Sequence, residues 1–252
     1  MKKVFIPLFF IVLIPFFALS SAFAYKSGGI CSWGLSGLRE GKIPTPPANG
    51  AKMLAENNGI FLGNTNEKKI YFTFDLGYEP GYTAKVLDIL KENDIKAVFF
   101  ICGAYLKEKD LLDRMISEGH AIGNHTDKHR DLPSLSDEGI RKDINTLSEN
   151  FKNLYGDVPL KYFRPPQGRF CERTLKAANE AGMKTVMWSI AIVDWSKTPI
   201  DAAACAKTIS SRLHPGAVLL LHITNSGTPE MLRLLLPVMK EKGYSAGHWN
   251  EL

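Results

Sequence analysis

Carboxylates, imidazoles and a guanidinium follow the apolar runs of this sequence, at the points where β-strands are expected to end. In parallel α/β folds the carboxyl ends of the strands meet on one open face, and this face holds the chemistry. Groups of these types could together supply a base, an acid, an orienting cation and ligands for a metal ion. The residues are Asp75, His125, His129, Arg164, Asp194 and His222.

The segment HTDKH holds two imidazoles, His125 and His129, four residues apart. One helical turn would put both on the same face, where they could chelate a divalent ion such as Zn²⁺. Two histidines in a polar stretch are otherwise often solvated or part of a turn. A carboxylate at a neighbouring strand end, Asp75, favours the metal site.

Asp75 closes the alternating run IYFTFD, and Arg164 precedes two prolines in RPPQG. An Asp after a strand can simply cap a turn, and a Pro- and Gly-rich segment can be an ordinary loop. Prolines nevertheless fix the backbone, and an arginine at a rigid strand exit can orient a carboxylate through paired hydrogen bonds. The two residues are therefore candidates for a base and its orienting group.

Asp194 and Trp195 end the apolar stretch WSIAIVDW, and His222 ends the run VLLLH. The tryptophan could line a sugar pocket or belong to the core, and a histidine after a buried strand is often only a core residue. Beside a buried carboxylate, however, His222 could act as a general acid.

Strands that alternate with helices position these groups and predict a parallel sheet or barrel in one domain, with about seven β/α units. Strands are expected at 70–74, 97–102, 121–122, 161–163, 184–189 and 217–221, with an edge strand near Tyr244. Helices are expected at 51–57, 83–91, 110–118, 137–155 with Ser136 as N-cap, 172–181, 200–213 and 229–241.

The chain has 252 residues, of which 45% are hydrophobic and 23% charged, as in globular proteins. Residues 1–24 resemble a secretory signal: Lys2 and Lys3 precede an apolar run, and Ala22-Phe23-Ala24 offers a cleavage site. A membrane anchor is the alternative, but the run is short for a span. Loss of both lysines lowers the net charge of +5 to +3. This charge fits an anionic cell-envelope substrate and equally suits solubility alone, and it gives no support to nucleic-acid binding.

The sequence has four cysteines, none of them in a CxxC pair, which argues against a zinc knuckle. Cys102 ends the apolar run AVFFIC and is expected to be a buried free thiol. In an oxidising compartment Cys171 and Cys205 are the candidate disulfide pair.

Five motifs in order resemble those of the polysaccharide deacetylase (NodB-homology) family, carbohydrate esterase family 4. They are TFDLGY for its TFDDGY, HTDKH for its H(S/T)xxH, RPPQG for its RPPxG, VDW for the end of its DxxDW, and LLH for its leucine-histidine motif. The segment FLGNTNEKKIYFTFDLGYEPGY resembles more narrowly the sporulation branch, the N-acetylmuramic acid deacetylases of spore cortex. The resemblance implies an α/β fold, a distorted (β/α)7 barrel of NodB-homology type.

The resemblance also implies a role for each matching residue in metal-assisted amide hydrolysis. Asp75 would activate water, Arg164 would orient Asp75, His222 would protonate the leaving amine and Asp194 would support the imidazolium. His125 and His129 would hold the divalent ion, zinc or similar, and Trp195 would line the acetyl pocket. Tyr105 or nearby backbone groups could add oxyanion donors.

Three positions depart from the family pattern. Leu76 replaces a metal-binding Asp, so the ion has two histidine ligands where a catalytic zinc site usually has three protein ligands, and it would have to recruit water, substrate or Asp75. Ala191 replaces the first Asp of DxxDW. Gln167 stands where the sporulation branch can carry a basic residue for the muramyl lactyl carboxylate, and Arg169 is the candidate substitute.

These observations predict a monomeric hydrolase that removes acetyl groups from N-acetylmuramic acid in peptidoglycan glycan strands, leading to muramic δ-lactam in spore cortex. The alternatives are a deacetylase of N-acetylglucosamine in peptidoglycan or chitin-like oligomers, and a catalytically silent glycan-binding module. We expect a signal peptide at 1–24, an N-terminal extension at 25–66 packed on the barrel, and a deacetylase domain at 67–252. The protein is expected in the cell envelope, for example between forespore and mother cell membranes, without a permanent membrane span.

Overall fold

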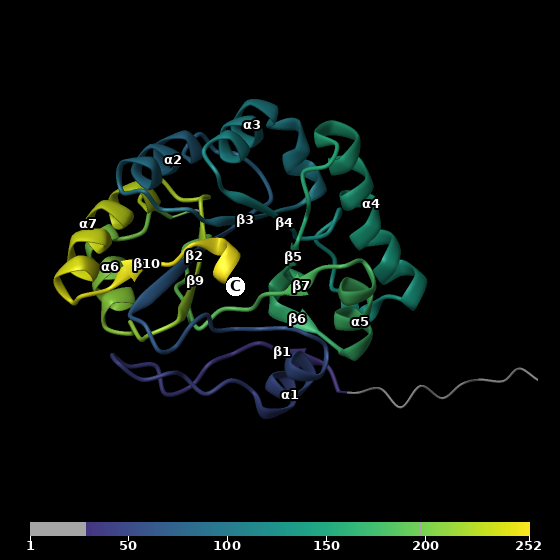
Figure 1. Ribbon diagram of the computed structural model, residues 1–252, viewed down its shortest axis with the longest axis horizontal. Coiled ribbons are helices and arrows are strands. Elements are labelled where there is room, and N and C mark those ends of the chain that lie inside the picture. The colour runs from purple at the N-terminus through teal and green to yellow at the C-terminus, as the bar shows by residue number, and fades with distance from the viewer. Residues whose placement is uncertain (1–28, 197) are drawn as a thin grey trace, which may run out of the picture.

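A curled, parallel β-sheet forms the centre of the molecule, and helices cover its outer side (Figure 1). The computed structural model describes residues 29–196 and 198–252, so the expected signal peptide lies outside the described residues. The strand order is β7-β5-β4-β3-β2-β9-β8, and β10 pairs with the start of β2. This curled half-barrel, with one helix after most strands, confirms the predicted distorted (β/α)7 barrel.

The strands of the main sheet are β2 (Lys69–Leu76), β3 (Val98–Ile101), β4 (Ala121–Asn124), β5 (Tyr162–Phe163), β7 (Lys184–Thr185), β8 (Ile190–Ala191), β9 (Ala217–His222) and β10 (Ser245–Ala246). The outer helices are α2 (Thr83–Glu92), α3 (Lys109–Ser117), α4 (Asp137–Tyr155), α5 (Glu172–Glu180), α6 (Ala202–Ser210) and α7 (Thr228–Glu241). Helix α4 has the predicted bounds, and the hydroxyl of Ser136 accepts a hydrogen bond from Gly139 N, as expected of an N-cap.

Alternation along the strands separates two layers of core. In β2 the side chains of Phe74 and Leu76 pack outward among those of the helices. Tyr71 belongs instead to a cluster of strand residues inside the barrel, and Asp75 continues this inner row. On every strand, alternate residues face the inside of the barrel, which we call the inner parity. Only residues of this parity can reach the mouth of the barrel.

The prediction of one strand over 184–189 is wrong, because β7 ends at Thr185 and the next strand, β8, begins only at Ile190. These short strands lie at opposite edges of the sheet order, so the few residues between them cross from one edge to the other. At the end of β7 and just after it, the chain pairs with Ile60: Ile60 N donates to Thr185 O and Met187 N donates to Ile60 O, both at 2.8 Å. Backbone pairing with an upstream segment therefore replaces regular strand pairing at this position.

The N-terminal segment lies along one side of the barrel, at the bottom of Figure 1. It carries β1 (Cys31–Ser32), which pairs antiparallel with β6 (Arg169–Phe170), and α1 (Ala48–Glu56). Trp33 packs with Phe170 in a separate cluster of apolar side chains beneath this segment. The segment is thereby fixed to the loop that follows β5.

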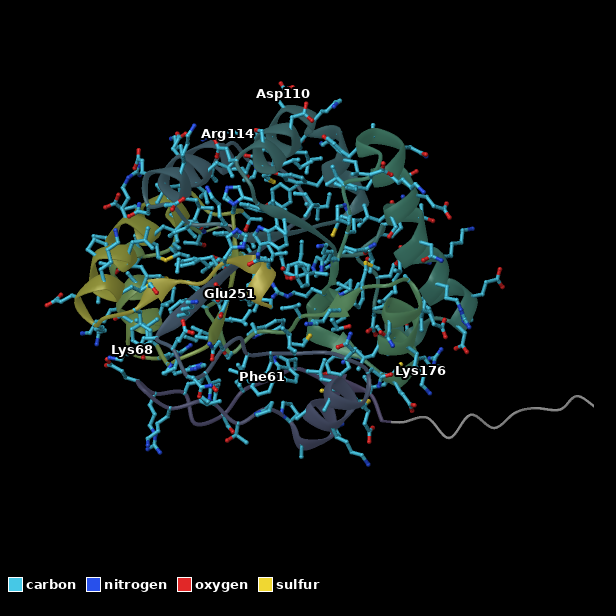
Figure 2. The ribbon with its side chains drawn as sticks, in the orientation of Figure 1. Phe61, Lys68, Asp110, Arg114, Lys176 and Glu251 are labelled. Atoms are coloured by element: carbon cyan, nitrogen blue, oxygen red, sulfur yellow. The ribbon has the colours of Figure 1, made fainter. Side chains whose placement is uncertain are left out.

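The C-terminal end of the chain closes the barrel at the amino ends of the strands. Glu251 lies in front of the sheet in Figure 2 and accepts a hydrogen bond from the Tyr71 hydroxyl at 2.9 Å. Trp249 and Leu252 pack with the inner cluster of strand residues. This segment leaves the opposite end of the barrel, where the strands terminate, uncovered.

The candidate disulfide does not form. All four cysteines are free thiols; Cys171 is buried beside Thr174, whereas Cys205 is half-buried on α6. Cys102 is buried, as expected. Among residues 29–196 and 198–252, no helix combines the length and apolarity that crossing a bilayer requires.

Candidate active site

The inner rows of neighbouring strands bring ionisable side chains together at the carboxyl end of the barrel. Asp75 on β2 is in register with His222 on β9. Arg164 follows β5, and His125 follows β4, each at the inner parity of its strand. Residues widely separated in sequence therefore line one cavity.

Asp75 is held by a buried arginine. Arg164 has no solvent exposure, and its Nη1 donates to Asp75 Oδ1 at 2.8 Å and to Thr73 Oγ1 at 2.9 Å, while its Nε donates to Val186 O. Burial alone would raise the pKa of Asp75, but the charge of Arg164, with a further contribution from His222, outweighs it and holds the pKa below its usual value. Asp75 is thus a carboxylate with one oxygen fixed and the other directed toward the cavity.

His125 and His129 are brought together by an irregular turn, so the expectation of one helical turn is wrong. Thr126 and His129 adopt positive φ of 68° and 52°. The buried carboxylate of Asp143 on α4 accepts from Lys128 N and thereby fixes the turn. The two imidazole centroids nevertheless lie 5.0 Å apart, as chelation of one ion requires.

His125 has a defined orientation. Its Nδ1 lies 2.8 Å from Arg164 O, so Nδ1 carries the proton and Nε2 keeps a free lone pair. Nε2 lies 3.5 Å from Asp75 Oδ2. Burial lowers the pKa of His125 to about 4 and also lowers the pKa of His129. Both rings are therefore neutral, which is the form that binds a metal ion.

His222 and Asp194 form the second ionisable pair. Nδ1 of His222 and its backbone N lie 2.7 Å from Oδ1 and Oδ2 of Asp194, which is fully buried. Burial alone would lower the pKa of His222, but the hydrogen bond and charge of Asp194 outweigh it and raise the pKa. The Trp195 ring contacts His222 edge-to-face, with centroids 5.2 Å apart. The ring nitrogen that remains, Nε2, is available to donate a proton.

Two adjoining cavities share these groups. One of about 570 Å³ is lined by Asp75, Leu76, Gly77, Tyr78, Cys102, Gly103, Ala104, His125, Asp127, Lys128, His129, His222 and Thr224. The other, of about 520 Å³, is lined by Trp33, Asp75, His125, His129, Gln167, Gly168, Trp188, Ala191, Trp195, Leu220 and His222. Aromatic walls beside polar groups suit a sugar ring, whose faces are apolar and whose rim is polar.

Tyr105 and Arg169, two of the predicted substrate-binding residues, do not line either cavity. The hydroxyl of Tyr105 is buried and donates to Glu79 Oε2 at 3.0 Å. Arg169 donates to the carboxylate of Asp131 and to Ser32 Oγ. The structure thus places Tyr105 in a support beneath the site and Arg169 in a surface ion pair.

Two of the three positions that depart from the family pattern, Leu76 and Ala191, carry apolar side chains. Leu76 is buried among the side chains that pack beneath the helices. At Ala191 it is the backbone that makes the polar contact, because its carbonyl accepts from Arg212 Nη1 at 3.0 Å. Neither position supplies a ligand or an ionisable group.

Several lining residues were not among the predicted site residues, and three of them matter for the chemistry: Trp33, Lys128 and Cys102. Trp33 comes from the N-terminal segment, and its Nε1 donates to Trp188 O at 2.9 Å. Pairing between segments so far apart leaves no local sequence signal. Lys128 and Cys102 could have been found, since Lys128 lies inside HTDKH and Cys102 follows an apolar strand at the inner parity.

A donor set for a divalent cation is present among the described residues. One ligand atom each from Cys102, His125 and His129 lie within 4.8 Å of one another. The neutral imidazoles and the hydrogen bond from His125 to Arg164 O are features of metal-binding histidines. The residues therefore fit a bound cation.

Comparison with known proteins agrees with this geometry. Residues 62–186 match the polysaccharide deacetylase family. The chain is 38% identical over 205 residues to the peptidoglycan-N-acetylmuramic acid deacetylase PdaA of Bacillus subtilis, covering 79% of this chain and 78% of that protein. It is 34% identical over 188 residues to a peptidoglycan-N-acetylglucosamine deacetylase of Bacillus cereus, covering 73% of this chain and 67% of that protein.

Solved structures show the same fold. The structure of PdaA, a family 4 carbohydrate esterase, superposes with a TM-score of 0.84 at 34% identity and covers 89% of this chain and 97% of that one. A family 4 pseudoenzyme from Bacillus anthracis gives a TM-score of 0.71 at 29% identity and covers 77% of this chain and 68% of that one. Similar folds thus occur in both an esterase and a pseudoenzyme, so any inference about activity has to come from the site residues.

Proposed function

Because this chain belongs to the polysaccharide deacetylase family, hydrolases that act on the amide bonds of N-acetyl sugars, we propose that it deacetylates N-acetylmuramic acid residues of peptidoglycan. The observation that carries the proposal is the pairing of Asp75 with Arg164 and of His222 with Asp194 around one cavity. A base and an acid, each with its own partner, are what hydrolysis of an unactivated amide requires.

Asp75 serves as the base. With its pKa held low it is ionised at neutral pH, and it accepts a proton from water as that water attacks the acetamide carbon. Family 4 deacetylases are generally metal-dependent, and a divalent cation bound by His125 and His129 would polarise the acetamide carbonyl. Arg164 keeps the carboxylate oriented and ionised while the proton is transferred.

His222 serves as the acid. The bond between the carbonyl carbon and the nitrogen breaks as His222 Nε2 donates its proton to the sugar amine, so the products are acetate and a free amino sugar. Asp194 holds the imidazole through Nδ1 and stabilises its charged form. The raised pKa keeps this acid protonated at a higher pH than a free imidazole.

Tryptophans provide the walls against which a sugar ring can pack. Trp33, Trp188 and Trp195 line the second cavity together with Asp75 and His222. A ring that stacks on these faces would present its 2-acetamido group to the ionisable pairs. The acetyl methyl would then lie near Trp195, which contacts His222.

The choice of muramic acid is supported by the similarity to PdaA and by one cation. N-Acetylmuramic acid differs from N-acetylglucosamine by a lactyl group, whose carboxylate is exposed in the absence of a peptide stem. Lys128 lines the cavity, and its Nζ lies 3.1 Å from Asp127 Oδ2 with most of the side chain in solvent. It is thus a candidate partner for the lactyl carboxylate. Deacetylation there leaves an amine beside the lactyl group, the precursor of muramic δ-lactam.

We further propose that the protein acts outside the cytoplasm, in spore cortex. Residues 1–24 have the charge pattern and apolar run of a secretory signal, and peptidoglycan lies beyond the membrane. Detection of the mature chain starting at Tyr25 in the envelope of sporulating cells would support this location.

The test is incubation of the protein with peptidoglycan followed by mass spectrometry of the muropeptides. Loss of acetyl groups, or lactam, on muramic residues alone is expected. Loss of acetyl groups from glucosamine residues would instead favour the alternative activity, deacetylation of N-acetylglucosamine. The similarity to the Bacillus cereus protein supports that alternative. No release of acetate from any glycan, with wild type equal to Asp75→Asn, would indicate a silent binding module.

A further inference from the structure

We propose that Cys102 supplies a third protein ligand to the divalent cation, so that this chain binds it through one thiolate and two imidazoles. The inference rests on the proposed function in that the cation serves the same site. Ligand atoms of Cys102, His125 and His129 lie within 4.8 Å of one another. Bonds of about 2.0 to 2.3 Å around zinc would draw such a set together by at most about 1.5 Å.

Strand geometry places Cys102 where a ligand is needed. Val98 and Phe100 of β3 belong to the inner cluster, and Cys102 continues their row past the end of the strand. Its backbone N donates to Leu76 O at 3.0 Å, so Cys102 leaves the sheet directly beside that residue. The thiol therefore lies on the cavity side, next to the position from which the family's ligand is missing.

The next residue joins Cys102 to the histidine turn. Gly103 N donates to the carbonyls of Thr126 and Asp127, each at 3.2 Å. A Cβ at position 103 would lie 2.0 Å from Asp127 Oδ1, so only glycine permits this approach. The thiol and the two imidazoles are thus held in a fixed relation by backbone contacts.

Leu76 cannot take this role, and its packing explains why the position tolerates an apolar residue. It belongs to the outer core with Phe74 and is almost fully buried. A carboxylate there would have to turn away from that core toward the cavity. In this chain the apolar side chain stabilises the core, and the ligand comes from the next strand.

The nearby carboxylates are already engaged. Asp75 is bonded to Arg164, and a base that abstracts a proton from water is better kept off the cation. Asp127 lies 3.1 Å from Lys128 Nζ. By contrast, the polar contact recorded for Cys102 Sγ is a weak one to His125 O at 3.5 Å. The thiol can therefore be recruited without breaking an ion pair.

The ligand type determines the kind of metal. Thiolate and imidazole together favour Zn²⁺ over the oxygen-preferring Mg²⁺, Ca²⁺ and Mn²⁺. A coordinating thiol gives up its proton, so binding would exchange the Sγ proton for the metal. Three protein ligands leave the fourth position open toward the cavity, as catalytic zinc sites have.

Cobalt substitution tests the proposal without reference to turnover. The full-length protein is freed of metal, loaded with one equivalent of Co²⁺, and examined for the near-ultraviolet band that thiolate bound to cobalt produces. The same titration is done with Cys102→Ser and with Cys205→Ser, a matched loss of a half-buried thiol on α6. Zn²⁺ affinity is measured by competition with a chelating dye, and circular dichroism checks that each variant folds.

The band is expected in wild type and in Cys205→Ser, and it should be absent in Cys102→Ser. Zinc affinity of Cys102→Ser should fall by more than the roughly 10- to 100-fold that outer-shell partners contribute. A thiolate band that survives Cys102→Ser, or one-equivalent binding by wild type without such a band, overturns the proposal.

Acetate release, measured on the same samples, separates this inference from the proposed function. Thiolate-bound cobalt in a protein inactive on every glycan would leave the ligand assignment standing and reject the function. Acetate release by a wild-type protein whose cobalt spectrum lacks the band would leave the proposed function standing and reject Cys102 as a ligand. Restoration of zinc binding without a thiolate band in Leu76→Asp/Cys102→Ala would show that the two positions supply the same ligand site.

Discussion

Arg164 Nη1 lies 2.8 Å from Asp75 Oδ1, and the guanidinium that makes this contact has no exposure to solvent. Its remaining terminal nitrogen, Nη2, has no hydrogen-bond partner among the described residues. A buried cation with an unused donor is costly, so its retention indicates that it serves the carboxylate.

We expect Arg164→Met to move the acidic limb of the pH–rate profile to higher pH. Burial then acts on Asp75 without the opposing charge, so the pKa rises and the ionised base is lost at a higher pH than in wild type. Unfolding free energy should also fall by about 3 to 5 kcal/mol, because a buried charge is left unpaired. The measurements are kcat/KM against pH and denaturant unfolding.

The matched control is Arg114→Met, which removes the ion pairs of Arg114 with Asp88 and Glu118 at the outer helices (Figure 2). It should cost about 1 kcal/mol or less per pair and leave the pH profile unchanged. An acidic limb that does not move in Arg164→Met would show that Arg164 does not set the ionisation of Asp75.

Asp194→Asn should shift the alkaline limb to lower pH. The pKa of His222 is raised by Asp194 against the effect of burial, with a further contribution from Asp75 and opposition from Arg164. Without the Asp194 charge the pKa falls, so His222 loses its proton, and the reaction its acid, at a lower pH. The rate at the optimum should fall by about 10²- to 10⁴-fold, the usual contribution of such catalysis. An unshifted limb with normal turnover would exclude His222 as the acid.

Lys128→Met should raise KM for a muramic acid substrate with a free lactyl carboxylate by about threefold to tenfold, as loss of a partly exposed charge pair would. KM for an N-acetylglucosamine oligomer should not change. Arg169→Met is the control, since Arg169 is paired with Asp131 outside both cavities. The opposite result, an effect of Arg169→Met alone, would return the lactyl contact to Arg169.

Trp33→Ala should raise KM for oligosaccharides by about twofold to tenfold, corresponding to loss of one aromatic contact. Trp33 reaches the second cavity from the N-terminal segment. Trp249→Ala is the comparison, because Trp249 packs at the closed end of the barrel. It should lower stability without affecting KM. Equal KM values for wild type and Trp33→Ala would remove Trp33 from the substrate site.

How much could be predicted from sequence depended on whether a feature was local. Ser136 and the apolar spacing after it marked helix α4 to the residue, because caps and periodicity act within a few residues. Asp75, Arg164 and His222 could be placed on one face because parallel strands end together. The turn from His125 to His129 could not be foreseen, since it depends on the distant Asp143.

Other features depend on long-range pairing or on side-chain direction. The strand predicted at 184–189 stops at Thr185, where the backbone bonds instead to Ile60, and no local sequence pattern predicts this pairing. Cys102 was expected to be buried, and it is, but its place beside two imidazoles emerges only when strand parity is combined with the turn. With Cys102 proposed as the third ligand, Leu76 no longer implies that the cation lacks one.

Ile60 also has a consequence for the order of folding. Its backbone partners, Thr185 and Met187, come far later in the chain, and Leu62 pairs with Ala217, later still. In a chain that is synthesised or translocated from its N-terminus, this segment emerges first but has nothing to pair with until most of the barrel has followed. Such long sequence separation slows assembly. Ile60 and Leu62 must therefore dock late, after the segments that carry Thr185, Met187 and Ala217 have emerged.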